Sequence, residues 1–384
     1  MDVEKNLKEK FTTALDVCVN QIRQNLPEFT EYFQDAASTN NFYKQIENTY
    51  WTTGFWTGQI WLAYEYSGDR VFKEAALLQV ESFYHRIRNK IEVDHHDMGF
   101  LYSLSCVAGY KLTGNLIAKE AALLAADQLL ARYHPKGEFI QAWGSMKEPE
   151  NYRLIIDCLL NVPLLYWATK ETGDPKYTEA GIKHTRTALA NVIRKDGSTQ
   201  HTFYFDPKSG KPTYGETCQG YSNDSSWARG QAWGVYGIAL SYRYTKDPKY
   251  IPLFQIVVDY YLKRLPEDLV PYWDLYFTKG NDQPRDSSSA AIVVCGILEM
   301  SQYLEADLSK KYIEVAKKIM VSLIDHYSVK SFATSNGLLL HGTYSNRSPY
   351  NTCNHCGVDE CTSWGDYFYM EALTRLVKEW EVYW

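Results

Sequence analysis

The chain has 384 residues, of which 45% are hydrophobic and 22% charged, as in ordinary globular proteins. Its 40 Lys and Arg against 46 Asp and Glu give a net charge of −6, and no basic cluster offsets it, so no nucleic-acid partner is expected. Aromatic residues are abundant, with 31 Tyr, 15 Phe and 11 Trp. They either pack the core or line a cleft in which the apolar faces of sugar rings stack.

No targeting or membrane segment is expected. The first residues are charged and then amphipathic, without the apolar stretch of a secretory signal. The longest apolar run, Ala290 to Leu298, is too short to span a bilayer, so we predict a cytoplasmic protein with no membrane association. Of the eight Cys, Cys106, Cys158 and Cys295 lie in apolar stretches and behave as small hydrophobic residues, so a disulfide framework is not expected.

The predicted helices follow one another in pairs. The first, around residues 7–22, carries one apolar stripe: Leu7, Phe11, Ala14, Leu15, Cys18 and Ile22. A short phrase, a small residue followed by Gly and Asp, then recurs in varied form at intervals of 46 to 73 residues: Ser67-Gly68-Asp69, Thr113-Gly114-Asn115, Thr172-Gly173-Asp174, Thr245-Lys246-Asp247 and, weakly, Glu305-Ala306-Asp307. Because Gly ends helices and Asp or Asn caps them, each phrase predicts the turn of a helical hairpin.

The two helices of each hairpin differ in kind. The runs after the phrases are amphipathic, whereas the runs before them are apolar on nearly every side: 54–66, 98–110, 158–168, 231–244, 289–300 and 367–376. A helix that is apolar all round is surrounded by other helices. We therefore predict an all-α fold, an (α/α)₆ barrel of six inner and six outer helices. With no strand-rich segment and no Pro- or Gly-rich linker, residues 1–384 are expected to form a single domain.

Polar and aromatic residues gather at the N-terminal ends of the predicted inner helices, which in such a barrel converge on one mouth. Two of these residues, Asp97 and Asp157, open consecutive inner helices 60 residues apart. Paired carboxylates can divide acid and base roles when their surroundings separate their pKa values. The alternative is that they only cap helices, the interpretation that we prefer for Asp286 and Asp366.

Two groups of residues raise the question of a metal. His95, His96 and His201 lack any established ligand spacing, and Cys353, His355, Cys356 and Cys361 lack a second paired motif. We expect no metal at either, and reduced thiols on a loop at the second.

Whole phrases of the sequence resemble glycoside hydrolase family 88, the unsaturated glucuronyl hydrolases, from about residue 48 to the end: Trp51-Thr-Thr-Gly-Phe-Trp56, Asp94-His-His-Asp-Met-Gly-Phe-Leu-Tyr102, Gln141-Ala-Trp143, Ile155-Ile-Asp157-Cys-Leu-Leu, His201-Thr-Phe-Tyr-Phe-Asp206, Trp227-Ala-Arg-Gly-Gln-Ala-Trp233-Gly and Trp364-Gly-Asp-Tyr367. The resemblance implies a cytoplasmic (α/α)₆-barrel enzyme that needs no cofactor. Its substrates would be the unsaturated oligosaccharides that polysaccharide lyases leave, with glycosaminoglycan-derived disaccharides such as those of chondroitin, hyaluronan or heparin among them.

The resemblance also implies roles for individual residues. Asp157 would donate a proton to C4 of the C4=C5 vinyl ether, and Asp97 would hold sugar hydroxyls and tune Asp157. Residues that match sugar-binding positions are Trp51, His96, Trp143, His201, Gln219, Arg229 and Trp233. Arg229 is suited to a carboxylate because its fork gives two parallel hydrogen bonds. One departure is Cys218, where some relatives have His.

A loop pattern bears on sulfated substrates. Some relatives carry Ser-x-x-Ser-x-Lys before the last inner helix, and this chain has Ser345 and Ser348 but Tyr350 in the Lys position. The alternatives to the main interpretation are an unsaturated rhamnogalacturonyl hydrolase and, more distantly, a non-enzymatic helical-repeat scaffold. The protein would be a monomer or a homodimer.

Overall fold

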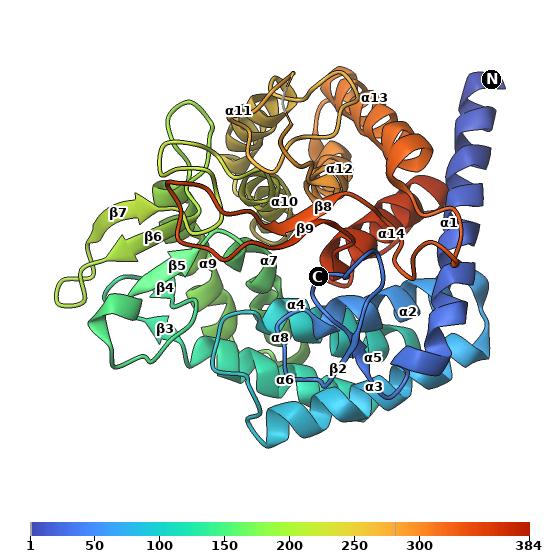
Figure 1. The fold of residues 1–384 in the computed structure, drawn as a ribbon. Coiled ribbons are helices and arrows are strands. Elements are labelled where there is room, and N and C mark those ends of the chain that lie inside the picture. The colour runs from blue at the N-terminus through green and yellow to red at the C-terminus, as the bar shows by residue number, and fades with distance from the viewer. Residues whose placement is uncertain (1, 281) are drawn as a thin grey trace.

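Helices form the frame of the molecule (Figure 1). The structure, a computed structural model, describes residues 2–280 and 282–384. Six helical segments are buried on nearly every side: α2 (Thr53–Ser67), α4 with η1 and α5 (Met98–Tyr102, Ser103–Val107, Ala108–Thr113), α7 with α8 (Cys158–Asn161, Pro163–Thr172), α10 (Ala228–Thr245), α12 (Ser287–Met300) and α14 (Ser363–Val377). They contact one another in a closed order, from α2 through α4, α7, α10, α12 and α14 back to α2.

A second set of helices buries one face each: α1 (Asp2–Phe29), α3 (Arg70–Arg88), α6 (Leu116–Leu130), α9 (Lys176–Val192), α11 (Tyr250–Leu262) and α13 (Ala306–Ser322), which continues into η4 (Leu323–Tyr327). Figure 1 shows α11 and α13 outside α10 and α12. The expected apolar stripe of α1 is confirmed, with Phe11, Leu15 and Ile22 fully or nearly fully buried. None of the described helices combines the length and the apolar character that a membrane crossing requires.

The recurring phrase makes the predicted turns wherever it contains Gly, whereas at Glu305-Ala306-Asp307 the cap of α13 is Glu305 and Asp307 lies inside the helix. Gly68 ends α2 in the left-handed conformation, with a φ of 71°, and the Asp69 carboxylate accepts from the Val71 N–H at the start of α3. Asn115 caps α6 in the same way. At Thr245-Lys246-Asp247, Lys246 adopts the left-handed conformation that Gly takes in the other turns, with a φ of 53°.

The prediction of an all-α fold is incomplete, because short antiparallel strands cover the ends of the helices. They form three two-stranded sheets and one three-stranded sheet: β1 (Phe33–Gln34) with β2 (Gln45–Ile46), β3 (Tyr133–His134) with β4 (Phe139–Ile140), β8 (Gly342–Ser345) with β9 (Cys356–Glu360), and β5 (Arg153–Ile155), β6 (Thr202–Phe205) and β7 (Pro212–Glu216). In the three-stranded sheet Ile155 pairs with Thr202, and β5 runs directly into Asp157. The strands are too short for a visible alternation of apolar and polar residues, and they hold the loops that carry the site. The short helices η2 (Pro149–Asn151) and η3 (Ser301–Tyr303) complete the described elements.

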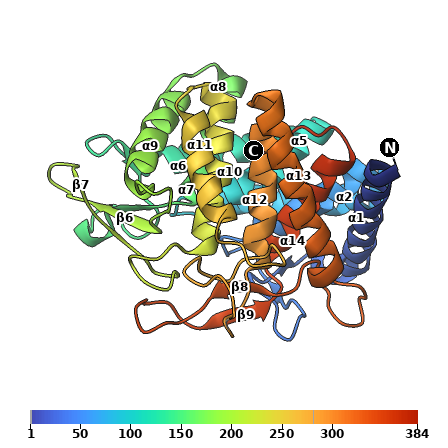
Figure 2. The ribbon, with the colours of Figure 1, turned by 90° about the horizontal axis from the view of Figure 1, so that it is seen from above.

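The last residues of the chain fold into the interior of the helical frame, where Figure 2 shows them among α5, α10 and α12. Val382, Tyr383 and Trp384 are each 1% exposed. The Trp384 ring lies parallel to Phe368 of α14, with 5.7 Å between ring centroids, and its indole N–H donates to Glu371. Glu371 also pairs with Arg375, so its buried charge is compensated.

Candidate active site

A cavity of about 460 Å³ opens where the N-terminal ends of the inner helices meet the β8–β9 loop. Predicted site residues line it: Trp51, His96, Asp97, Trp143, Asp157, His201, Gln219, Arg229, Trp233 and Ser345. Ser348 does not line the cavity, because its hydroxyl turns away to donate to the carbonyl of Tyr221, 2.6 Å distant. Two lining tyrosines, Tyr50 and Tyr344, were not predicted. Their hydroxyls are 2.9 Å apart, although the residues are 294 positions apart in the chain.

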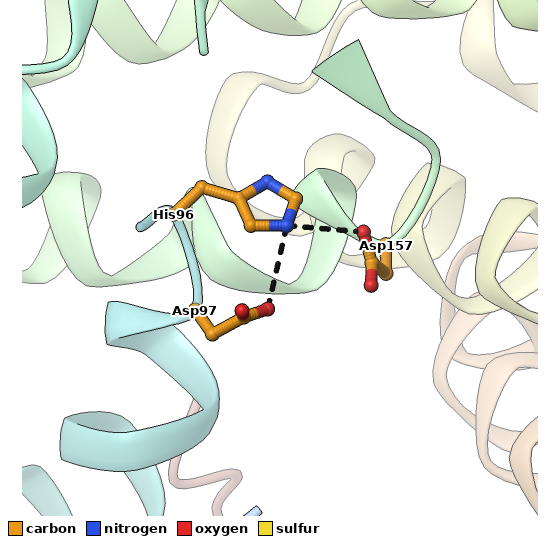
Figure 3. Close-up of side chains that lie close together, drawn as sticks. All are labelled: His96, Asp97 and Asp157. Carbon is orange, nitrogen blue, oxygen red and sulfur yellow. Dashed lines mark ion pairs between the residues drawn. The ribbon is translucent and has the colours of Figure 1, made fainter. Parts of the chain in front are cut away.

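Two of the lining residues are carboxylates with one imidazole between them (Figure 3). His96 Nε2 is 3.4 Å from Oδ1 of Asp97 and 3.4 Å from Oδ1 of Asp157. Asp97 begins α4 and Asp157 begins α7, but neither side chain caps its own helix. Both carboxylates are therefore free to face the cavity, which disfavours the interpretation that they serve only as caps.

The two carboxylates have pKa values that move in opposite directions. Burial raises the pKa of Asp157 well above its ordinary value, and the negative charge of Asp97 raises it further. Burial also acts to raise the pKa of Asp97, but the neighbouring His96 and a hydrogen bond from His95 outweigh it, so that pKa is lowered. One carboxyl is thus protonated where the other is ionised, the arrangement that acid catalysis requires near neutral pH.

The imidazoles at the cavity are neutral. Burial lowers the pKa of His96 to about 4 and that of His201 to about 3. His201 Nδ1 accepts hydrogen bonds from the backbone N–H groups of Cys218 and Gln219, at 3.0 and 3.2 Å. In the neutral ring the proton is therefore on Nε2, which makes His201 a hydrogen-bond donor at its other nitrogen.

Arg229 is held by the protein itself. Its Nη1 is 3.3 Å from the Asp286 carboxylate and also donates to the carbonyl of Thr343, while Nη2 donates to the carbonyl of Tyr344 at 2.6 Å. Two indole rings flank its guanidinium, those of Trp227 and Trp364. The two parallel hydrogen bonds that Arg229 was expected to donate to a substrate carboxylate would therefore compete with the bonds that its guanidinium nitrogens already make within the protein. Asp286 is the partner of Arg229, and its side chain does not cap α12, which corrects its interpretation as a helix cap.

Asp366 also does more than begin a helix. It lies in the first turn of α14 rather than at the cap, which is Thr362, and its carboxylate accepts from the N–H of Leu339 and the hydroxyl of Tyr43. Through the bond to Leu339, the Asp366 carboxylate holds the loop that precedes β8. Its interpretation as a helix cap is therefore wrong.

Aromatic rings form the walls of the cavity. The ring of Trp51 stacks on Trp364, with centroids 5.5 Å apart, and its N–H donates to the Tyr344 hydroxyl. Trp143 is 48% exposed, and its ring covers the guanidinium of Arg153, whose central carbon lies 3.7 Å from the ring centroid. Trp233 is 1% exposed, so it supports the wall from behind more than it offers a free face.

One group of side chains is close enough to hold a metal ion. One ligand atom from each of His96, Asp97 and Asp157 lies within 4.8 Å of the others, and no second such group occurs in residues 2–280 and 282–384. A metal ligand must be deprotonated, so a cation here would compete with the proton that burial and Asp97 favour on Asp157. The Cys residues 353, 356 and 361 do not gather around His355. Cys353 and Cys356 line the cavity, whereas Cys361 is buried beside Ser335. All eight Cys are free thiols.

Known proteins match this chain over nearly its whole length. Residues 23–375 match the model of Glycosyl Hydrolase Family 88. The chain is 51% identical over 386 residues to the unsaturated chondroitin disaccharide hydrolase of Streptococcus pneumoniae, covering 100% of this chain and 96% of the relative. The crystal structure of unsaturated glucuronyl hydrolase from Streptococcus agalactiae matches with a TM-score of 0.95 and 50% identity, covering 98% of this chain and 94% of that one. A mutant of that enzyme complexed with dGlcA-GalNAc6S matches with a TM-score of 0.87 and 47% identity, at the same coverage. The chain therefore belongs to glycoside hydrolase family 88.

Proposed function

We propose that this hydrolase releases the unsaturated uronic acid from lyase-generated disaccharides of the chondroitin type, with Asp157 as the proton donor. The observation that carries the assignment of Asp157 is the placement of its half-buried carboxyl in the cavity, 3.4 Å from His96 Nε2, with its pKa raised beside the ionised Asp97. The relative at 51% identity is a chondroitin disaccharide hydrolase, which supports the substrate class. No match described above supports a rhamnogalacturonyl hydrolase or a non-enzymatic scaffold.

The proposed reaction begins with proton transfer. The Asp157 carboxyl protonates C4 of the C4=C5 vinyl ether, and the electron pair of the double bond forms the new C–H bond. C5 becomes an oxocarbenium-like centre, which the ring oxygen and the negative charge of Asp97 stabilise. Asp157, now ionised, is placed to accept a proton from the water that adds to C5.

The hydrated product then opens without further catalytic groups. The C5 hemiketal breaks its bond to the ring oxygen and becomes a ketone, which leaves a hemiacetal at C1. Collapse of that hemiacetal releases the next sugar. The neutral His201 is placed to donate a hydrogen bond through Nε2 to a sugar hydroxyl or carboxylate, and Trp51 and Trp143 offer aromatic walls for the sugar faces.

We propose that the closed order of buried helices and the surrounding helices form one (α/α)₆ barrel, a single catalytic domain over residues 1–384. The contacts of α14 with both α1 and α2 support this, since they join the two ends of the chain. The eight free thiols support a reducing compartment, and hence the cytoplasm.

The test is an absorbance assay, because hydration of the C4=C5 bond destroys the conjugated enoate chromophore. Wild-type protein should bleach unsaturated chondroitin disaccharides, and a panel with hyaluronan and heparin disaccharides ranks its preference. Asp157→Asn should reduce kcat by about 10² or more while its circular dichroism spectrum stays unchanged. A variant that retains the wild-type rate would remove Asp157 from the mechanism.

A further inference from the structure

Three tyrosines form an exposed aromatic surface outside the cavity. The rings of Tyr221 and Tyr276 stack, with centroids 5.1 Å apart and an interplanar angle of 21°, and Tyr350 sets its edge against Tyr221 at 5.3 Å. Tyr276 and Tyr350 are each 63% exposed. We call these three residues the tyrosine platform. A contiguous exposed aromatic patch beside a cavity is a candidate binding surface.

Buried hydrogen bonds hold the platform in place. Asp274, which is fully buried, accepts from the backbone N–H of Tyr221 with one carboxylate oxygen, at 2.8 Å, and from that of Tyr276 with the other, at 2.9 Å. The Ser348 hydroxyl donates to the carbonyl of Tyr221 and accepts from the N–H of Tyr350. Each of the three residues is thus fixed through its backbone, so their rings are presented with little freedom left to lose on binding.

The platform continues directly from the cavity. Tyr221 follows the lining residue Gln219 by two positions, and Tyr350 precedes the lining residue Thr352 by two. Two residues of chain span at most about 7 Å. The Asn351 side chain donates to the carbonyl of Gly220 at 2.9 Å, which ties the two segments together at the cavity mouth.

We propose that the tyrosine platform binds the sugar rings of longer unsaturated oligosaccharides, beyond those held in the cavity. This rests on the proposed function, in which the unsaturated sugar at the non-reducing end reaches Asp157 in the cavity. The rest of the chain must then leave through the mouth. The cavity of about 460 Å³ lies in the lower part of the range for small-molecule sites, roughly 300–1,000 Å³, so further sugars lie outside it. Phenol rings stack on the apolar faces of sugars and offer hydroxyls to their polar edges.

The test compares an unsaturated disaccharide and an unsaturated tetrasaccharide, both from unsulfated chondroitin so that sulfate plays no part. Tyr276→Ala should lower kcat/KM for the tetrasaccharide by about three- to tenfold, the usual worth of one aromatic contact. The disaccharide value should change less than about twofold. Tyr214→Ala is the matched control, because Tyr214 is 55% exposed and stacks on Tyr204 in the same manner, with centroids 4.8 Å apart. It should leave both values unchanged.

The outcomes separate the platform from the activity on which it rests. If the wild type bleaches the disaccharide but the ratio of the two kcat/KM values stays the same in Tyr276→Ala, the platform does not bind substrate. Rejection of the tetrasaccharide by the wild type overturns it as well. Loss of a dimer in sedimentation of Tyr276→Ala, with an unchanged ratio, would assign the surface to a second copy of the chain instead. Absence of disaccharide turnover in the wild type refutes the proposed function itself, and the platform with it.

Discussion

Asp97→Asn tests the electrostatic coupling between the two carboxylates. The substitution keeps the shape of the side chain and removes its charge. One carboxylate oxygen of Asp97 lies within 4.8 Å of one of Asp157. Two unit charges at this distance repel by about 3.5 kcal/mol at an effective dielectric constant of 20. That exceeds the 1.4 kcal/mol that corresponds to a factor of ten in an equilibrium constant. His96 does not offset the repulsion at neutral pH, because its pKa of about 4 leaves it uncharged.

The sign of the effect on the pH profile follows. Asp157 must be protonated to act, so activity falls as the pH rises through its raised pKa. Without the charge of Asp97 that pKa drops, and the basic limb of kcat/KM should move to lower pH. The acid limb, which reports the ionisation of Asp97 in the coupled pair, should disappear. We also expect kcat to fall by about 10² or more while KM changes less than about tenfold.

The measurement is the bleaching rate of an unsaturated chondroitin disaccharide from about pH 3 to about pH 9, a range that begins below the ordinary carboxyl pKa and ends above the ordinary imidazole pKa. Asp224→Asn serves as the control, since Asp224 is exposed and lies outside the cavity. Its profile should match that of the wild type. A basic limb that stays at the wild-type pH in Asp97→Asn would refute the coupling and leave burial alone to raise the pKa of Asp157.

Four further outcomes follow from the site. Asp157→Asn should raise the free energy of unfolding at neutral pH by about 1 kcal/mol. The raised pKa of Asp157 means that the folded state disfavours the ionised carboxylate, so this residue destabilises the fold at any pH above the ordinary carboxyl pKa, and the gain from the substitution should vanish in acid. A lower melting temperature of the variant at neutral pH would contradict this. The free energy of unfolding should fall as the pH drops below 6.5, because His96 binds a proton more readily in the unfolded chain than in the folded protein; His96 alone should contribute about 2.5 kcal/mol at about pH 4.5. Equal free energies of urea unfolding at neutral pH and at about pH 4.5 would exclude this effect. Dialysis against a strong chelator should leave activity unchanged, and recovery only with an added metal would make His96, Asp97 and Asp157 ligands instead. Tyr350→Lys should raise the kcat/KM of a sulfated disaccharide relative to its unsulfated counterpart by about tenfold, through a charge-assisted bond that Tyr cannot give; an unchanged ratio means that this loop does not reach the sulfate.

Hydrophobic pattern was sufficient to predict the helical frame. The buried helices are apolar on all sides, and the turns carry Gly and Asp at the cap positions, so local and global signals agree at α2, α3 and α6. The π-helical stretch Ser103–Val107 inside the second buried helix could not be predicted, because its sequence is as apolar as the helix around it. The strands escaped prediction because most of them have two to four residues.

Site residues at the starts of helices could be predicted from the sequence. Site residues on strands and loops that are distant in the chain could not. Asp97 and Asp157 follow from their places at the starts of α4 and α7. Tyr344 reaches the cavity from β8, and no local signal connects it with Tyr50 or Trp51. Ser348 was misplaced for the same reason, since the partner of its hydroxyl is a carbonyl 127 residues away.

The contacts between the two ends of the chain set an order for its synthesis and folding. The side chains of Gln21 and Asn25 in α1 donate to carbonyls of Ser335 and Asn336, more than 300 residues later, and α1 packs on α14. A nascent chain thus carries the faces of α1 and α2 that pack on α14 without this partner until α14 has been synthesised, whereas α2 already contacts α3 and α4. Such contacts of long sequence separation slow folding and leave intermediates exposed to aggregation. Truncated chains that lack α14 and the inserted Trp384 should accumulate as aggregates or as chaperone clients rather than as partly active enzyme.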